Sequence, residues 1–556
     1  MSNKSNGAAN ALVQGSILAV ASIISRIIGL IYRIPMQNIL GDVGNSYYAT
    51  AFEIYNVMLI ISSYSLPLAV SKMVSAQMAK KKRKAVYQIL KCALVFATIS
   101  GTIVALVLFF GGEFIASTLL NTPFSIFAIK VLAPGLLIVA ILGVIRGFFQ
   151  GLGTMLPSAI SQIIEQIVNA IVSVWAAYVL FNTGTRIGAV LGDKENYSAA
   201  YGAAGGTLGT VSGAIAALLF VLVIFMVYMK VFKKQMKKEH GVNVSSFGYT
   251  MKILILTVCP VLLSTTVYNI SGIVDQGIFK QVAHLQGYSD KVVNELWGAF
   301  TGKYKLLINV PISIASAMAA SFVPVLTSSF ARGDEVEIKN QINTSTRFVM
   351  VIAFPCAVGL AVLAMPICSI LFRSKDTIET NPTAALMMYI GAIAVIFYAL
   401  STLSNGLLQG INKMSVPVIN AFISLVAHVI VLVALMLFFR LNIYAVVIAN
   451  AFFALLMCVL NSMALKKYSG YSQEVRKTFI IPALCSIIMG VLTFLVYNGI
   501  YMLCKINIIA FIFAMLVAVV VYFVTLLLFK GLTEDEMLKF PKGSSMIRIA
   551  KKIHLM

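Results

Sequence analysis

Residues 507–529 of the chain read NIIAFIFAMLVAVVVYFVTLLLF, with no charged side chain among them. At a helical rise of about 1.5 Å per residue, a run of this length extends about 34 Å, enough to cross the hydrocarbon core of a bilayer. The apolar residues are continuous and do not alternate with polar ones, which excludes the strands of a membrane β-barrel. This stretch therefore predicts a transmembrane helix.

Runs of the same kind recur along the whole chain. Working outward from 507–529, we predict further spanning helices at 12–34, 49–71, 87–110, 124–149, 157–182, 201–229, 251–279, 299–325, 346–371, 383–410, 415–439, 443–465 and 478–503. The predicted fold class is an all-α polytopic membrane protein with 14 transmembrane helices. The longest loops between the spans have about 20 residues, which leaves no room for a large catalytic domain.

The composition excludes several other classes of protein. Of the 556 residues, 60% are hydrophobic and 11% are charged. Ordinary soluble domains have roughly 25% charged residues, and disordered chains are poor in apolar ones. A nucleic-acid partner is excluded as well, because few charges are available for a binding surface. The net charge of +23, from 42 basic and 19 acidic residues, therefore needs another explanation.

Basic residues gather in alternate loops, and this asymmetry predicts the orientation of the chain. With the N-terminus in the cytoplasm, the basic groups at 80–84, 230–238, 466–477 and 530–552 all fall on the cytoplasmic side, where they meet anionic lipid head groups. We therefore predict a multi-pass membrane protein with both termini cytoplasmic. The small, polar first eleven residues predict no signal peptide.

A short motif occurs twice and indicates an internal repeat. Residues 147–151 (Gly-Phe-Phe-Gln-Gly) end the fourth span and residues 406–410 (Gly-Leu-Leu-Gln-Gly) end the tenth, followed by Pro157 and Pro417. Spans two and eight match more weakly, so we predict two six-helix lobes plus two C-terminal helices. The predicted boundaries are 1–229 for the N-lobe, 230–250 for a basic cytoplasmic linker, 251–465 for the C-lobe, 478–529 for the last two spans, and 530–556 for a basic cytoplasmic tail.

Two arginines lie inside the first predicted span. Arg26 is near its middle, where a charged side chain costs several kcal/mol in lipid unless it faces a cavity or a partner. Arg33 is closer to the outer end, from which a long side chain can extend to the interface. We predict a functional or paired role for Arg26, and for Arg33 either such a role or that extension.

The fifth span carries four polar residues, Gln162, Glu165, Gln166 and Asn169. Their offsets of 3, 4 and 7 residues place them along one helical stripe. A stripe of this kind does not face lipid; it lines either a water-filled cavity or a buried helix contact. Glu165 could pair with Arg26, or could serve as a cation or proton site.

Four further ionisable residues lie toward the outer ends of spans: Glu53, Asp275, Lys303 and Lys305. Each of them fits either a solvated helix end or the wall of a central cavity. Together with the arginines they would give a cavity of mixed charge with a basic excess. Such a cavity suits an anionic head group such as a phosphate.

Motifs for other chemistries are missing from the sequence. There is no P-loop, Gly-x-Ser-x-Gly or His-Glu-x-x-His pattern, the seven cysteines form no Cys-x-x-Cys pair, and the four histidines are scattered. We therefore expect no enzyme activity, no metal and no cofactor. Transport would draw its energy from a gradient of a coupling ion, Na⁺ or H⁺, from the membrane potential, or from the substrate gradient.

Three segments resemble a known family. Residues 25–35 (Ser-Arg-Ile-Ile-Gly-Leu-Ile-Tyr-Arg-Ile-Pro) resemble the first span of the lipid-linked oligosaccharide flippases of the MOP superfamily. Residues 147–157 and 161–169 are similar to its Gram-positive SpoVB and YtgP branch, which is close to the MurJ lipid II flippases. Two six-helix lobes with two extra spans also fit MATE- and MurJ-like proteins, and the resemblance covers essentially the whole chain.

The resemblance implies a transporter of the bacterial cell membrane that flips a polyprenyl-pyrophosphate-linked glycan precursor, lipid II for peptidoglycan above all, by alternating access. By motif, Arg26 and Arg33 match span-one arginines that bind the pyrophosphate, although their spacing here is one residue longer. Lys303 or Lys305 would supply a basic charge in span eight, and the last two spans would help form a groove for the lipid tail. The implied partners are this substrate, membrane lipids and the cell-wall synthesis machinery.

Three other functions are open at this point. The cargo could be a capsule, teichoic or spore-cortex unit instead of lipid II. A MATE-type cation-coupled antiporter of small molecules would have twelve spans and mainly acidic cavity residues. An intramembrane polymerase or ligase for wall glycans would need a carboxylate and large external loops. The span count and the basic residues favour the lipid-linked anion.

Overall fold

The computed structural model describes residues 2–239, 245–531, 548 and 551, and within these residues every regular element is helical. The chain divides into two compact units, the N-unit (Met1–Gly298) and the C-unit (Ala299–Met556). This division lies beyond the predicted linker at 230–250, and the extent of the two predicted lobes stays a prediction. The predicted basic tail, 530–556, falls largely outside the described residues.

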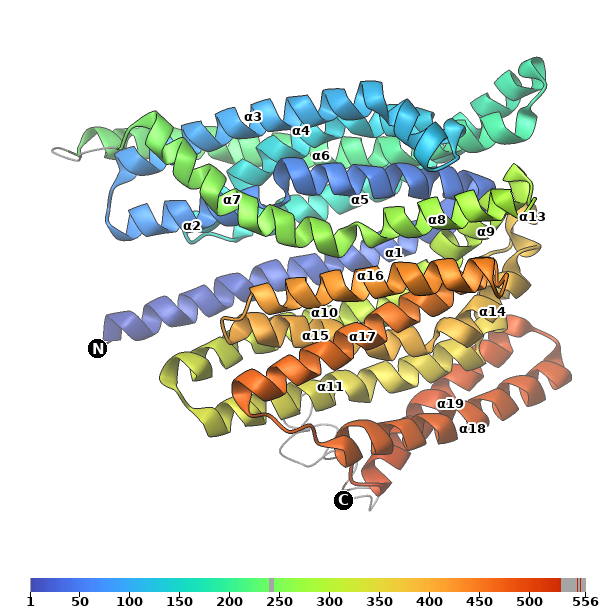
Figure 1. The fold of residues 1–556 in the computed structure, drawn as a ribbon. Helices are drawn as coiled ribbons and strands as arrows, with labels where there is room; N and C mark the ends of the chain where they lie inside the picture. Colours follow the sequence, from blue (N-terminus) through green and yellow to red (C-terminus); the bar gives the residue numbers. More distant parts are fainter. Residues whose placement is uncertain (1, 240–244, 532–547, 549–550, 552–556) are drawn as a thin grey trace. The chain divides into compact units, whose positions relative to one another are not determined.

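The N-unit contains the blue-to-green helices of Figure 1. Its α-helices are α1 (Ser2–Leu59), α2 (Leu66–Ala79), α3 (Arg83–Phe114), α4 (Ile126–Gly151), α5 (Leu156–Leu191), α6 (Lys194–Lys237), α7 (Phe247–Asn269), α8 (Ser271–Leu285) and α9 (Asp290–Ala299). Short helical turns continue two of these helices and precede another: η1 (Ile60–Tyr64) after α1, η2 (Ile115–Leu119) after α3, and η3 (Pro123–Ser125) before α4.

The C-unit contains the yellow-to-red helices of Figure 1. It begins with the π-turn η4 (Phe300–Tyr304) and continues with α10 (Lys305–Arg332), α11 (Glu335–Val362), α12 (Ala364–Leu371), α13 (Lys375–Ile378), α14 (Asn381–Gly391), α15 (Ile393–Gly410), α16 (Ser415–Leu437), α17 (Ile443–Ser469), η5 (Arg476–Ile480), α18 (Ile481–Cys504) and α19 (Asn507–Leu528). The last two helices form a pair that corresponds to the two predicted C-terminal spans.

A single glycine separates the first two predicted spans. The backbone at Gly41 has φ 67° and ψ −178°, a conformation that glycine adopts at little cost because it lacks a Cβ. In Figure 1 the part of α1 after this kink runs back in the opposite direction to the part before it. The predicted span 12–34 therefore lies in the first arm of α1, and the predicted span 49–71 begins in its second arm and continues through η1 into α2.

The predicted count of fourteen spans is not confirmed. Among the described residues, twelve helical segments are long and apolar enough to cross a membrane. Residues 20–34 of the first predicted span and the whole of the second fall within one such segment, Val20–Ala79. The seventh is divided between α7 and α8, and the apolar stretch found among the described residues of α7, Phe247–Val258, is shorter than the twelve segments. The class itself, an all-helical protein of many membrane spans, is confirmed.

Helices α5 and α6 pack through small residues on α6. A Cβ atom at Gly205 would overlap the backbone of Ala176, and one at Gly209 would overlap Ser173. Glycines at these positions allow the two helices to approach closely, which is a common way to pack helices in lipid, where burial of apolar surface provides little drive.

The repeated motif makes an equivalent contact in each unit. In the N-unit, Gly147 of α4 lies against Pro67 of α2, since a Cβ there would be 2.6 Å from the carbonyl oxygen of Pro67. In the C-unit, Gly406 of α15 lies against Val323 of α10, at 3.0 Å from its Cγ2. The fourth predicted span thus packs on the second, and the tenth packs on the eighth.

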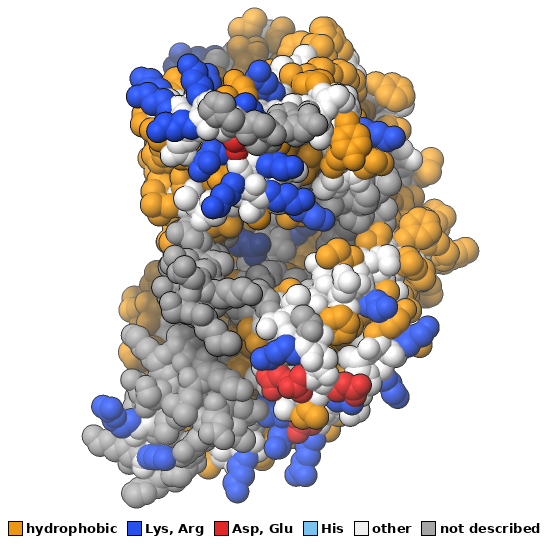
Figure 2. Space-filling model, turned by 90° about the vertical axis from the view of Figure 1, so that its left-hand side faces the viewer, with side chains coloured by type: hydrophobic (Ala, Val, Ile, Leu, Met, Phe, Trp, Pro, Cys, Tyr) orange, Lys and Arg blue, Asp and Glu red, His pale blue; other side chains and the backbone are white. Residues whose placement is uncertain are grey.

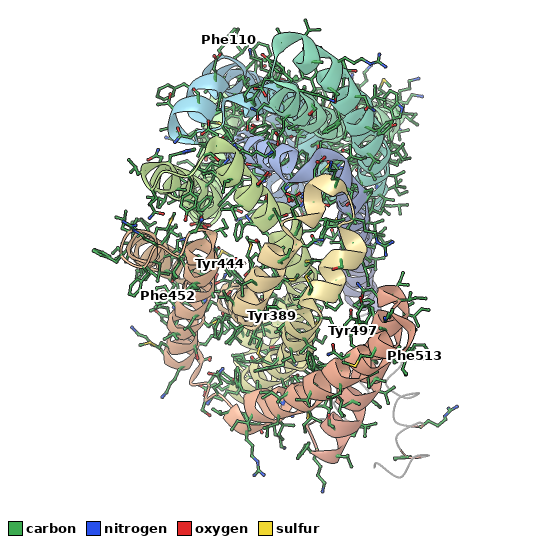
Figure 3. The ribbon with its side chains drawn as sticks, turned by 90° about the vertical axis from the view of Figure 1, so that its right-hand side faces the viewer. Phe110, Tyr389, Tyr444, Phe452, Tyr497 and Phe513 are labelled. Carbon is green, nitrogen blue, oxygen red and sulfur yellow. The ribbon has the colours of Figure 1, made fainter. Side chains whose placement is uncertain are left out.

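Large apolar side chains cover the outward faces of both units. Phe110 of α3 is 75% exposed and Phe513 of α19 is 51% exposed, and Figure 3 shows both at the periphery of their units. Exposed aromatic and aliphatic groups in such numbers would aggregate in water, whereas in a bilayer they contact lipid chains.

Candidate functional site

The polar stripe of the fifth predicted span lies against α1. Ser22 Oγ donates a hydrogen bond of 3.5 Å to Gln162 Oε1. One turn along α5, Gln166 Oε1 lies 3.7 Å from the position that a Cβ on Gly29 would take. The sequence left open whether this stripe lines a water-filled cavity or a helix contact. In the structure, both glutamines lie at a contact between α5 and α1.

Asn169 continues this contact and ties three helices together. Its Nδ2 donates to the hydroxyl of Tyr32 on α1 at 3.3 Å, and its Oδ1 accepts from Ser173 Oγ at 2.8 Å. Ser173 also lies 2.7 Å from the carbonyl oxygen of Gly206 on α6. Asn169 is buried, so these hydrogen bonds satisfy an amide that lipid could not solvate.

Glu165 is paired by a residue that the sequence analysis did not single out. Arg146 of α4 places Nη2 at 2.8 Å from Glu165 Oε2, and its Nε donates to Ser161 Oγ at 2.8 Å. Arg146 lies near the end of the fourth predicted span, 124–149. The available signal was that Arg146 and Glu165 flank the same short turn, 152–155, which brings their helices together.

Arg26 and Arg33 lie seven residues apart on α1, close to one face of the helix. Both side chains are exposed in the protein. Arg33 interacts electrostatically with Tyr48, Tyr32 and Glu53. The arginines alternate with Ser22 and Gly29 at offsets of 4 and 3 residues, so they border the α1–α5 contact. Two guanidinium groups and two side-chain amides are therefore gathered along the two helices; we call these four side chains, Arg26, Arg33, Gln162 and Gln166, the arginine–glutamine stripe.

The acidic residues predicted for the site lie at the junction of α1 with α8. The Glu53 carboxylate rests on Gly272 of α8, where a Cβ atom would lie 2.6 Å from Oε2. Asp275, one turn further along α8, is buried. Both therefore belong to the N-unit, and neither lies at a solvated helix end.

Lys303 of η4 is completely buried in the C-unit. Its Nζ donates to the carbonyl oxygen of Thr377 at 2.6 Å, to Thr380 Oγ1 at 2.5 Å and to Asn381 Oδ1 at 3.2 Å, and it lies 5.6 Å from the centre of the Phe372 ring. The side chain thus holds the loop between α12 and α14. Its neighbour Lys305 is partly buried at the start of α10. Substrate binding by either lysine stays a prediction.

A second buried lysine was missed because it follows the seventh predicted span, where a lysine fits a solvated helix end. Lys280 of α8 is completely buried. Its Nζ donates to Ser46 Oγ of α1 at 3.0 Å and to Asn294 Oδ1 of α9 at 2.8 Å. One turn along α1, Thr50 Oγ1 accepts from Gln276 Nε2. We call these five residues, Ser46, Thr50, Gln276, Lys280 and Asn294, the Lys280 seam.

One end of the N-unit is strongly basic. Figure 2 shows this gathering of Lys and Arg side chains, which come from the loop between α2 and α3 and from the end of α6. Within it, the Glu239 carboxylate accepts hydrogen bonds of 2.9 Å from the backbone N–H groups of both Arg83 and Lys84 at the start of α3. This is the end that the charge pattern assigns to the cytoplasm.

The pair α18–α19 presents an apolar outer face. Val491 and Leu495 of α18 and Leu516 and Val519 of α19 are all more than half exposed. Figure 3 shows Tyr497 and Phe513 on this pair, and Tyr497 donates a hydrogen bond of 2.9 Å to Asn507 Oδ1, which joins the two helices. In the part of the chain that the structure describes, no cluster of three His, Cys, Asp or Glu side chains could hold a metal ion.

Known proteins resemble the chain along nearly its whole length. The family described as polysaccharide biosynthesis protein matches residues 12–330, and the family described as lipid II flippase MurJ matches residues 303–509. The lipid II flippase MurJ of Bacillus subtilis (strain 168) is 25% identical over 493 residues, which are 86% of this chain and 87% of that protein. Stage V sporulation protein B of the same organism is 22% identical over 531 residues, covering 94% of this chain and 96% of that protein.

Solved structures share the fold. A lipid II flippase MurJ in an inward closed conformation superposes with a TM-score of 0.63 at 16% identity, over 91% of this chain and 97% of that one. An inward-facing multidrug resistance transporter of the MATE family gives a TM-score of 0.61 at 14% identity, over 81% and 96%. These similarities concern the arrangement of the helices.

Proposed function

This chain belongs to the polysaccharide biosynthesis protein family and is a MurJ-like flippase of the MOP superfamily, and on that premise we propose that it moves lipid II, a polyprenyl-pyrophosphate-linked glycan precursor, across the bacterial membrane. It is a transporter and not an enzyme. The observation that carries the choice of cargo is the match to a named lipid II flippase over 86% of this chain.

The arginine–glutamine stripe is the part of the chain best suited to the charged end of such a cargo. A guanidinium group donates two parallel hydrogen bonds to phosphate oxygens and keeps its charge at any physiological pH. Arg26 and Arg33 lie about two turns apart, or about 10 Å, which suits two contacts to one extended anionic head group. The amides of Gln162 and Gln166 add uncharged donors beside them.

Movement of the cargo is proposed to follow alternating access, with both termini in the cytoplasm. The basic end of the N-unit supports this orientation through the rule that positive charge stays inside. The long, exposed apolar face of α18–α19 would accommodate the lipid tail. A gradient of Na⁺ or H⁺, or the membrane potential, would supply the energy, and the cell-wall synthesis machinery would receive the product.

The proposal is tested in a strain that depends on this protein for growth. Lipid II at the cell surface is measured by labelling intact cells while the protein is depleted and replaced by variants. Arg26→Ala and Arg33→Ala should each reduce surface lipid II at least tenfold, since each removes a charge-assisted contact worth about 1.5–3 kcal/mol. Arg186→Ala, an exposed arginine of α5 outside the stripe, is the matched control and should behave as wild type.

Two results would redirect the proposal. If depletion leaves surface lipid II unchanged while another lipid-linked glycan accumulates inside, the cargo is that glycan. The match to a sporulation protein over 94% of this chain makes a spore-cortex unit the first one to examine. If no lipid-linked glycan accumulates and everted vesicles extrude small cations, the chain is a MATE-type antiporter.

A further inference from the structure

The Lys280 seam joins two antiparallel stripes. On α1, Ser46, Thr50 and Glu53 follow each other at helical spacing; on α8, Lys280, Gln276 and Gly272 lie opposite them in reverse order. The five seam residues are at most 5% exposed, so the contact is closed to water. In an open form of this seam, α8 and α9 would be separated from α1 and water would reach Nζ of Lys280.

The hydrogen bonds around Lys280 fit an uncharged amine. An ammonium group has three N–H donors, whereas an amine has two donors and a lone pair. Among the described residues, Nζ of Lys280 has two acceptors, Ser46 Oγ and Asn294 Oδ1. Ser46 Oγ also donates to Asn294 Oδ1 at 2.9 Å, which leaves the Ser46 oxygen free to accept from the lysine. Both acceptors are neutral, so no opposite charge in the seam compensates an ammonium ion.

The titratable groups on the surrounding helices lie mostly outside the seam. They are Asp42 and Glu53 of α1, Asp275 and His284 of α8, Asp290, Lys291 and Glu295 of α9, and Asp193 and Glu195 beside the start of α6. Lys291 bridges Glu195 at 2.8 Å and Glu295 at 3.9 Å, while Asp290 is 88% exposed and lies 3.4 Å from His284. Asp290 is the carboxylate that acts on Lys280 through space.

Burial has a larger effect on the pKa of Lys280 than Asp290 has. It holds the pKa of the Lys280 amine well below its ordinary value, and Asp290 offsets the shift only in part. Gln276 Oε1, one turn away, is a buried acceptor with no partner among the described residues, which makes complete closure of the seam costly. The closed seam therefore disfavours the protonated lysine. Binding of a proton by Lys280 would shift the equilibrium toward the open form.

We propose that Lys280 is a proton-binding site that couples protonation to the opening of the contact between α1 and the α8–α9 pair. In the closed seam Nζ is neutral. When the seam opens, Nζ takes a proton from a hydronium ion: one O–H bond breaks, one N–H bond forms on the lone pair, and a water molecule is left. Closure reverses this step. The inference rests on the proposed function in one respect: it names H⁺ as an ion to which flipping responds.

The direction of the pH effect follows from linkage. Because closure lowers the proton affinity of Lys280, the closed form is most favoured above the ordinary lysine pKa of about 10.4. As the pH falls below that value, the ratio of open to closed seams rises by up to tenfold per pH unit, until the pH reaches the lowered pKa of the closed form. Acidity therefore opens the seam.

Hydrogen–deuterium exchange of the full chain in lipid nanodiscs measures this ratio without any transport. Exchange of segments 42–53 and 271–298 is followed from about pH 6.5 to about pH 9.5, after correction for the intrinsic pH dependence of amide exchange. In wild type the open fraction should rise steeply as the pH falls. K280M, which cannot bind a proton, should remain closed and show no pH dependence, and K280R should be open throughout. K291M, which removes an exposed lysine of α9, should follow wild type.

An open fraction in wild type that does not change with pH, or a K280M variant with the same pH dependence as wild type, would overturn the proposal. If K280R does not fold, the comparison of K280M with wild type still tests whether Lys280 is the proton-binding site. Failure of the proposed function is seen separately. A cell that transports no lipid-linked glycan, with pH-dependent exchange that K280M abolishes, would keep the proton site and reject the cargo.

Discussion

Lys280 in the N-unit and Lys303 in the C-unit are both completely buried, yet their surroundings differ. Lys303 donates to three oxygens and lies over the face of Phe372, a set of partners that matches the three donors and the charge of an ammonium group. Lys280 donates to two neutral oxygens, a set that matches an amine. The difference teaches that burial alone does not define the role of a lysine: the number and charge of its acceptors decide whether it locks a loop or exchanges a proton.

Removal of each lysine should separate these roles most clearly. K303M removes three hydrogen bonds to the α12–α14 loop in a buried site and should destabilise the chain by about 3–5 kcal/mol. K280M leaves Ser46 and Asn294 hydrogen-bonded to each other and should cost only about 1–2 kcal/mol. Thermal unfolding of the detergent-solubilised protein measures both. The control K375M, an exposed lysine of α13, should change stability by less than about 0.5 kcal/mol. Equal losses for K280M and K303M would contradict the distinction.

The repeated glycine motif offers a second comparison between the units. In G147A the new methyl group would lie 2.6 Å from the backbone oxygen of Pro67, and backbone yields poorly, so we expect a loss of about 1–3 kcal/mol. In G406A the methyl group meets a side-chain carbon of Val323 at 3.0 Å. That methyl can shift, and the better helix propensity of alanine offsets part of the cost, so we expect less than about 1 kcal/mol. The same unfolding measurement tests this order, and a G406A variant that loses more stability than G147A would contradict the inference that Gly147 has the tighter contact.

The smallest effect is expected from the Arg–Glu ion pairs, of which each unit provides one among the residues that the structure describes. Arg146–Glu165 is the more buried, with side chains 13% and 23% exposed, whereas Glu474, the partner of Arg347 in the C-unit, is 35% exposed. Double-mutant cycles with alanine should give a coupling energy of about 1–2 kcal/mol for the first pair and less than about 1 kcal/mol for the second, which water screens more. A coupling near zero for Arg146 and Glu165 would mean that Glu165 has another main partner.

The sequence predicted how some residues of the candidate site are arranged, and their part in transport stays a prediction. Periodicity placed Gln162, Glu165, Gln166 and Asn169 on one stripe, and the structure keeps them along α5, against α1 and α4. The same reasoning could not supply Arg146, because a basic residue near a loop fits a solvated position equally well. Lys280 was missed for the same reason. Lys303 was selected, but its contacts with Thr377, Thr380 and Asn381 come from residues more than 70 positions away, as the separations of 74, 77 and 78 show.

The sequence by itself determined that this is an all-helical membrane protein, that a motif repeats between the fourth and tenth spans, and which ends of the helices are basic. These properties follow from length, hydrophobicity and charge along one stretch of chain, since the bilayer imposes the same demand on every span. Only the tertiary structure decided that Glu165 pairs with Arg146, that Lys303 holds a loop and that Lys280 closes a seam. Such pairings depend on which helix faces join, and the apolar faces of membrane helices carry little information about their neighbours because lipid and protein are nearly equivalent surroundings for them.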